Sequence, residues 1–144
     1  MRNDSAQGAA AAFLTAIDQG EANAVWECFS TGARQFVIDR GIRRGLSPVA
    51  GASILDGTAS PHFRDQFLED LLAGLRRDLE LVRLPLVEIG TVSPLDDRRV
   101  RVIYLERFDV PLGPPLEPLP VGSVELVEED GGWRVERLIP RPGG

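Results

Sequence analysis

Apolar residues recur with the period of an α-helix in the first half of the chain and with the period of a β-strand in the second half. Three short amphipathic segments, over 5–20, 21–29 and 30–41, each carry one apolar face and are separated by residues that favour helix ends. The strongest helical pattern starts at Ser60, from which phenylalanine and leucine recur every four residues. We therefore predict four helices, the last of which has to end before Pro85.

Beyond Pro85, β-branched and polar residues alternate as they do in strands with one covered face. Strands are predicted over 86–92, 99–110, 121–128 and 133–139. The pair Asp130-Gly131 between the last two is a strong signal for a two-residue hairpin turn. The predicted fold class is α+β, with N-terminal helices packed on a curved antiparallel sheet of four to five strands.

The length of 144 residues fits one domain, mainly helical over 1–83 and mainly strand over 84–140, with a tail at 141–144. The segment 41–59 carries no sustained period and is interrupted by glycines. It is interpreted either as a functional flap or as a segment that contains a short fifth strand at 52–55.

Charge and composition narrow the partners that the protein can have. The chain holds 16 basic residues, all arginine, against 22 acidic residues, for a net charge of −6 at pH 7. This balance argues against binding to nucleic acid or to an anionic membrane. The apolar run 9–14 is flanked by Asp4 and Asp18, unlike a signal peptide, and is interpreted as a helix of a cytoplasmic protein.

Two stretches resemble a known superfamily. FLTAIDQGEANAVWECFS resembles the opening helix, glycine break and second helix of the nuclear-transport-factor-2-like superfamily, and GSVELVEEDGGWRVERLIP resembles its closing hairpin. That superfamily has the cone-shaped α+β fold of ketosteroid isomerase and SnoaL-type cyclases. The resemblance implies a pocket between the curved sheet and the helices, used by an enzyme, a ligand carrier or a docking module, and a possible homodimer. The catalytic signatures of its isomerases and epoxide hydrolases are missing, so no functional residue is carried over.

Strand alternation points to a pair of charged residues. Tyr104, Glu106 and Phe108 fall on the more apolar face of their strand, where Glu106 is the polar exception. A regular Asp130-Gly131 hairpin places Val124 opposite Arg137, so Arg137 is the exception on the last strand. The two charges either form an ion pair at the rim of the sheet or make the polar end of a pocket. In the second interpretation Glu106 is an acid or base, Arg137 binds an anion and Tyr104 donates a hydrogen bond.

His62, the single histidine, lies in the first turn of the long helix with Asp65 one turn later. The two are either a proton-transfer pair at a pocket mouth or ordinary surface residues. Arg40 and its neighbours in DRGIRRG either meet a phosphate or carboxylate or lie in a solvated loop. One histidine and one cysteine provide no zinc-ligand set, and we expect no metal and no cofactor.

The favoured function is the binding of a small hydrophobic molecule in an apolar pocket between the helices and the curved sheet. Candidate lining aromatics are Trp26, Phe36, Phe67, Phe108 and Trp133. One alternative is a cofactor-independent acid–base enzyme of the isomerase, cyclase or dehydratase type, which would use Glu106 or the His62–Asp65 pair. Another alternative is a protein interaction or dimerisation module.

Overall fold

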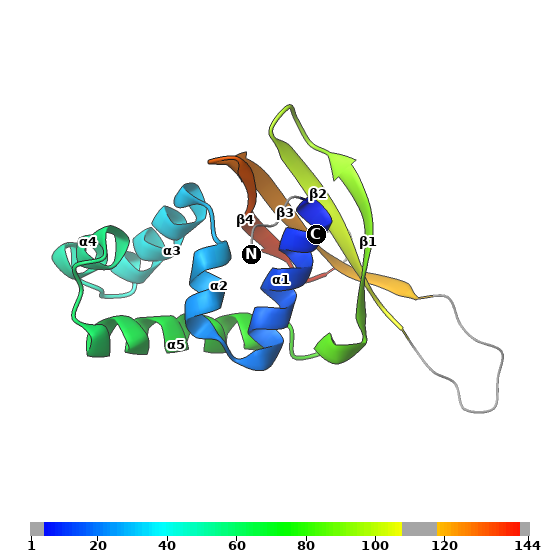
Figure 1. The fold of residues 1–144 in the computed structure, drawn as a ribbon. Coiled ribbons are helices and arrows are strands. Elements are labelled where there is room, and N and C mark those ends of the chain that lie inside the picture. Colours follow the sequence, from blue (N-terminus) through cyan, green and yellow to red (C-terminus); the bar gives the residue numbers. More distant parts are fainter. Residues whose placement is uncertain (1–4, 108–117, 142–144) are drawn as a thin grey trace.

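The computed structural model describes residues 5–107 and 118–141. Helices precede an antiparallel sheet (Figure 1), which confirms the α+β class. The helices are α1 (Ala6–Gln19), α2 (Ala22–Cys28), α3 (Thr31–Arg43), α4 (Pro48–Asp56) and α5 (Pro61–Asp78). A 3-10 turn, η1 (Leu84–Leu86), leads into β1 (Val87–Pro94), β2 (Arg99–Glu106), β3 (Leu119–Glu129) and β4 (Gly132–Ile139).

Local capping sets the helix boundaries. The Ser5 hydroxyl accepts a hydrogen bond from the Gly8 amide at 2.9 Å, and α1 ends at Gly20, whose φ of 74° is left-handed. α3 begins in the same way at Ser30, whose hydroxyl accepts from the Ala33 amide at 3.0 Å. The helices predicted over 5–20, 21–29 and 30–41 correspond to α1, α2 and α3, and the long helix ends before Pro85 as predicted.

The segment 41–59 contains no strand, because the helix α4 lies within it. Ser47 caps this helix by accepting from the Ala50 amide at 3.0 Å, Pro48 occupies its first turn, and it ends at left-handed Gly57. Gly51 weakens the apolar period but is required by packing, since a Cβ there would lie 2.7 Å from a methyl group of Ile38. The predicted fifth strand at 52–55 is therefore wrong, and the sheet has four strands among the described residues.

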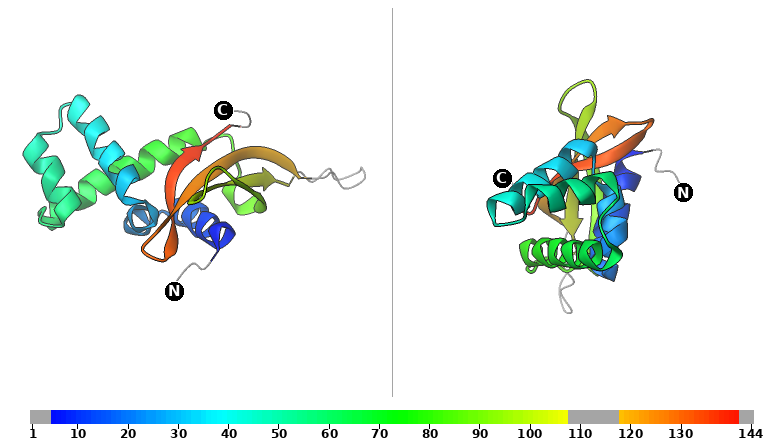
Figure 2. Two further views of the ribbon diagram at one scale, coloured as in Figure 1. Left: turned by 90° about the horizontal axis from the view of Figure 1, so that it is seen from above. Right: turned by 90° about the vertical axis from the view of Figure 1, so that its left-hand side faces the viewer.

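Three irregularities interrupt the pairing of the four strands, which lie in the order β1-β2-β3-β4 with every neighbouring pair antiparallel. They fall between Ile89 and Val92, at Tyr104/Leu105, and at Glu125/Leu126. Such bulges bend and twist a sheet, and Figure 2 shows the strands curving around α1. Phe13 on α1 belongs to the same buried cluster as the inward-facing side chains of the sheet.

The third irregularity changes the face on which Arg137 lies. The β3–β4 pairing is regular as far as Leu126 opposite Val135, and there β4 inserts one extra residue. Beyond it, Val124 lies opposite Leu138, while Arg137 lies opposite Glu125. The predicted opposition of Val124 and Arg137 is therefore wrong by one residue. A regular register would place an unpaired guanidinium against fully buried Val124, which costs more than a bulge.

The helices α3 and α4 and the first half of α5 form an arm that extends away from the sheet (Figures 1 and 2). The base of this arm is fixed by α5, whose Leu68 and Leu72 are buried. Arg76 on α5 also donates to the carbonyl oxygens of Ile17 and Asp18 on α1, both at 3.1 Å. These bonds fix α5, and with it the arm, to α1, which packs on the sheet.

In the part of the chain that the structure describes, no helix is long and apolar enough to cross a membrane.

Tyr104 is the largest fully buried side chain among the residues that the structure describes, and Gly122 makes room for it. The two residues are partners across β2 and β3, and the Tyr104 hydroxyl donates to the Ile139 carbonyl oxygen at 3.3 Å. A Cβ on Gly122 would overlap the Tyr104 hydroxyl and the Ile139 carbonyl. This strand position therefore admits only glycine.

Gly122→Ala should destabilise the protein by about 3 kcal/mol, because neither the buried ring nor the backbone carbonyl can move aside. Gly74→Ala on α5 is the control, since its new methyl group meets no atom within 4 Å and should stabilise the helix by about 0.5–1 kcal/mol. Urea unfolding of both variants measures the two changes. Equal effects would contradict this packing.

Burial raises the pKa of Tyr104 to about 12. Because a raised pKa favours the neutral phenol in the folded state, this contribution to stability is complete below about pH 10 and is lost as the pH rises through about 12. Tyr104 is the only tyrosine, so the ultraviolet absorbance of tyrosinate reports it alone. We expect its titration near pH 12 in native buffer and near pH 10 in urea. A native midpoint near pH 10 would show that the ring is solvated.

Candidate functional site

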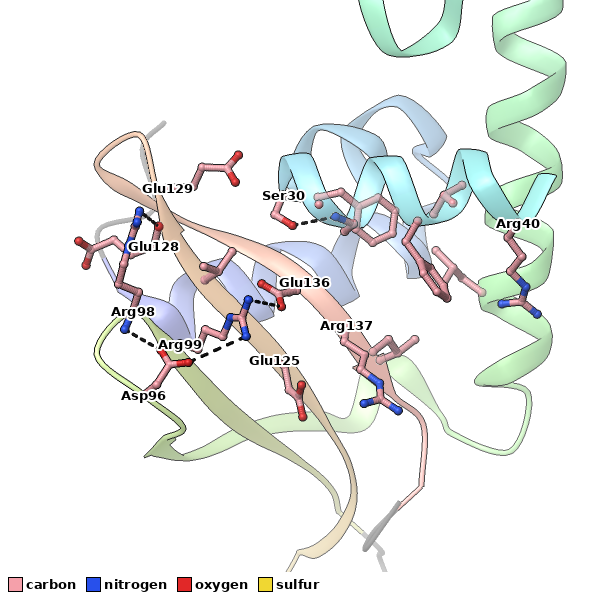
Figure 3. A pocket seen from close by; sticks show the side chains of 18 of the residues that line it. Ser30, Arg40, Asp96, Arg98, Arg99, Glu125, Glu128, Glu129, Glu136 and Arg137 are labelled. Carbon is pink, nitrogen blue, oxygen red and sulfur yellow. Dashed lines mark hydrogen bonds and ion pairs between the residues drawn. The ribbon is translucent and has the colours of Figure 1, made fainter. Parts of the chain in front are cut away.

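A groove of about 1480 Å³ lies between the helical arm and the β3–β4 hairpin (Figure 3). Its helix wall is mainly apolar and comes from α3 and α5. The apolar residues of this wall are Ala33, Phe36, Val37, Leu71 and Leu75. Phe36 is 59% exposed, whereas Val37, Leu71 and Leu75 are half-buried. An exposed phenylalanine beside three half-buried aliphatic side chains gives this wall a hydrocarbon surface that water contacts.

The strand wall of the groove is charged. Arg99 lies 3.3 Å from the Glu136 carboxylate and 3.9 Å from that of Asp96. Beside this cluster, Arg101 on β2 donates to Glu125 on β3 at 2.9 Å. The Arg101–Glu125 pair joins neighbouring strands, whereas Arg99–Glu136 reaches from β2 across β3 to β4 and Arg99–Asp96 is local to the β1–β2 turn. All these partners stay partly solvated. Each pair contributes about 1 kcal/mol or less to stability, so their main effect is to orient the groove's charges.

The start of α3 is fastened to the hairpin, which sets the angle between the two walls. The Ser30 amide donates to the Val135 carbonyl oxygen at 2.9 Å, extending a bridge between Phe29 and Val135. The carboxylate of Glu129 accepts from the Thr31 amide at 3.1 Å and from the Thr31 hydroxyl at 2.8 Å. A carboxylate at this place also interacts favourably with the N-terminal end of the helix dipole.

Two arginines project from opposite sides of the groove, Arg40 from α3 and Arg137 from β4 (Figure 3). Both are exposed, and neither forms a hydrogen bond or ion pair with its side chain among the described residues. Arg137 lies directly across from Glu125, but that carboxylate is engaged by Arg101. The guanidinium groups of Arg40 and Arg137 are therefore available to a ligand.

Glu106 does not lie in the groove and does not pair with Arg137, so neither of the two arrangements predicted for these residues is present. It is 3% exposed at the end of β2, where its Oε1 accepts a hydrogen bond from the Arg83 amide. Its Oε2 lies 3.8 Å from Nη2 of the same arginine. The apolar face of β2 was predicted correctly, but Glu106 there fastens the segment before η1 to the sheet.

Most of the predicted aromatic residues are core residues. Trp26 is 3% exposed and packs edge-on against Phe67, with ring centroids 6.1 Å apart. Tyr104 is fully buried, and Trp133 is half-buried at the start of β4. Phe36 is the predicted aromatic that lines the groove, and Phe108 lies outside the described residues.

His62 and Asp65 are exposed in the first turns of α5 and do not line the groove. Asp65 instead borders a smaller hollow of about 280 Å³ beside the start of α2. The structure joins the two side chains by no hydrogen bond among its described residues. The interpretation of this pair as surface residues fits these positions.

The predicted residues Phe36 and Arg137 thus meet in one groove, and Arg40 joins them. Arg40 belongs to the last turn of α3 and not to a loop. Glu125 and Glu129 were missed because their roles depend on the bulge and on the contact between α3 and the hairpin. The sequence did show that Phe36 and Val37 lie on an apolar stripe of α3. It could not show that this stripe leaves Phe36 exposed and so forms a second apolar surface.

Among the described residues, no group of three or more histidine, cysteine, aspartate or glutamate side chains is arranged to hold a metal ion. Comparisons with profiles of protein families, with curated proteins and with solved structures find no match.

Glu129→Ala should lower the free energy of unfolding by about 1 kcal/mol, because the Thr31 amide and hydroxyl lose their acceptor. Hydrogen exchange at the Thr31 amide should accelerate. Glu128→Ala is the matched control, since its side chain is exposed and its bonds to Arg98 are made by its backbone amide and carbonyl, which the substitution keeps. If the two variants exchange equally fast at Thr31, the fastening of α3 by Glu129 is wrong.

Proposed function

We propose that the protein binds a small, mainly apolar molecule in the groove between the arm and the β3–β4 hairpin. The observation that carries the proposal is the exposed Phe36 on a hydrocarbon wall that faces charged strands. Leaving such a surface in water has a cost of about 25 cal/mol per Å² relative to covering it. A ligand that covers Phe36 and its neighbours recovers that free energy.

The size of the groove indicates how a ligand would sit. Pockets for small ligands usually measure about 300–1000 Å³, and this groove is larger, at about 1480 Å³. A small molecule would therefore occupy part of it, against the helix wall, with one side toward the solvated charges of β3 and β4. The face of the sheet that packs on α1 is filled by Val102, Val124 and other buried side chains. The groove is the better location for a ligand.

We also propose that the chain belongs with the nuclear-transport-factor-2-like superfamily. The support is the order of its elements, helices followed by a curved antiparallel meander, together with the closing hairpin at Asp130-Gly131. Its departure from the usual pattern is the arm, in which α4 occupies the place of an early strand. A homodimer and a cytoplasmic location stay predictions.

The binding proposal is tested with the uncharged dye N-phenyl-1-naphthylamine, whose fluorescence rises in apolar surroundings. The protein should enhance the fluorescence, and Phe36→Ser should weaken binding about tenfold, because a buried aromatic contact is lost. Val49→Ser on α4 is the matched control, since Val49 is 81% exposed and lies outside the groove. It should bind the dye as the unaltered protein does. Equal binding by all three proteins, or no binding by any, would overturn the proposal.

A further inference from the structure

We infer that the groove prefers an amphipathic monocarboxylate, whose tail covers the Phe36 wall and whose carboxylate is bound by one of the two guanidinium groups that border this wall, that of Arg40 or that of Arg137. This inference rests on the proposed function and adds the chemical class of the ligand. The juxtaposition behind it is that two arginines, whose side chains have no partner in the described ranges 5–107 and 118–141, border the same apolar wall, one from α3 and one from β4.

The four arginines that line the groove are not equivalent. Arg99 is occupied by Asp96 and Glu136, and Arg98 donates to the Glu128 carbonyl oxygen at 2.8 Å. The other two, Arg40 and Arg137, have no such partners among the described residues. Guanidinium groups bind carboxylates strongly because two parallel N–H groups match two oxygens. An anion entering the groove therefore finds two guanidinium groups that no described carboxylate has paired.

The acidic residues of the groove restrict the charge that the ligand can carry. Seven carboxylates and four guanidinium groups line the groove in the described ranges, so its net charge is negative. Most of these acids lie on the β1–β2 turn and on the hairpin, where Arg99, Arg101 and Thr31 engage four of them. Asp78 is the acid on the helix wall. A dianion such as a phosphate monoester is repelled more strongly than a monocarboxylate, which favours the singly charged head group.

The placement of the arginines also fits a ligand with a tail. In Figure 3, Arg40 on α3 and Arg137 on β4 lie on opposite walls of the groove, and carbon side chains of the lining lie between them in this view. Leu138, next to Arg137, adds an aliphatic side chain to this surface. When either guanidinium binds the head group, the ligand's hydrocarbon chain can lie against the apolar side chains of the groove, away from the charged β1–β2 turn.

The test compares three ligands with the same ten-carbon chain, decanoate, decanol and decylamine, by displacement of N-phenyl-1-naphthylamine below micelle-forming concentrations. Decanoate should displace the dye at about tenfold lower concentration than decanol, and decylamine should be the weakest. The double variant Arg40→Gln/Arg137→Gln should lose this preference for decanoate and bind decanol unchanged.

The control is Arg43→Gln/Arg77→Gln, which removes the same charge from exposed arginines of α3 and α5 that do not line the groove. It should keep the preference for decanoate, and circular dichroism should show both double variants folded. Equal binding of decanoate and decanol, or a preference for decylamine, would overturn the inference and leave the apolar site standing. Loss of the preference in both double variants would also overturn it, because the effect would then follow net charge alone. Failure of every ligand and of the dye would instead overturn the proposed function.

Discussion

An unpaired guanidinium is not tolerated inside a hydrocarbon core, and the arrangement of the β3–β4 hairpin follows from this constraint at Arg137. One extra residue in β4 moves the side chains beyond it to the opposite face of the sheet. Leu138 therefore lies opposite Val124, and Arg137 lies opposite Glu125. The same displacement gives the groove its only charge on β4 without a partner among the described residues. Core packing and the chemistry of the groove are thus set by a single bulge.

The second requirement is a fixed angle between the arm and the sheet. The backbone bond from Ser30 to Val135 and the acceptor role of Glu129 hold the first turn of α3 against the hairpin. At the other end, Arg76 fastens α5 to the last turn of α1. The apolar residues of α3 and α5 therefore face β4 across a gap and cannot collapse onto it. This geometry explains how Phe36 stays exposed in an otherwise well-packed protein.

Much of the fold could be predicted because it depends on local chemistry. Serine caps, the glycine at position 20 and the Asp130-Gly131 turn act over a few residues, and the helices and strands that they border are present. The apolar face of β2, with Val102, Tyr104 and Glu106, was also visible as simple alternation.

The rest depends on contacts between distant segments, which no short pattern contains. α4 was missed because Gly51, which packs against Ile38, interrupts its apolar stripe. Glu106 was expected to meet Arg137, but Arg83, from the segment before η1, occupies its carboxylate. A bulge cannot be located by counting alternate residues, because it is the place where that counting changes phase.

The register of the hairpin is the most direct test of this account. Nuclear Overhauser effects between backbone protons of β3 and β4 report which residues lie opposite one another. We expect cross-strand effects between Val124 and Leu138 and between Glu125 and Arg137, and none that pairs Val124 with Arg137. A pairing of Val124 with Arg137 would mean that the strand is regular, that the guanidinium faces the core, and that the groove lacks the arginine on which its proposed chemistry depends.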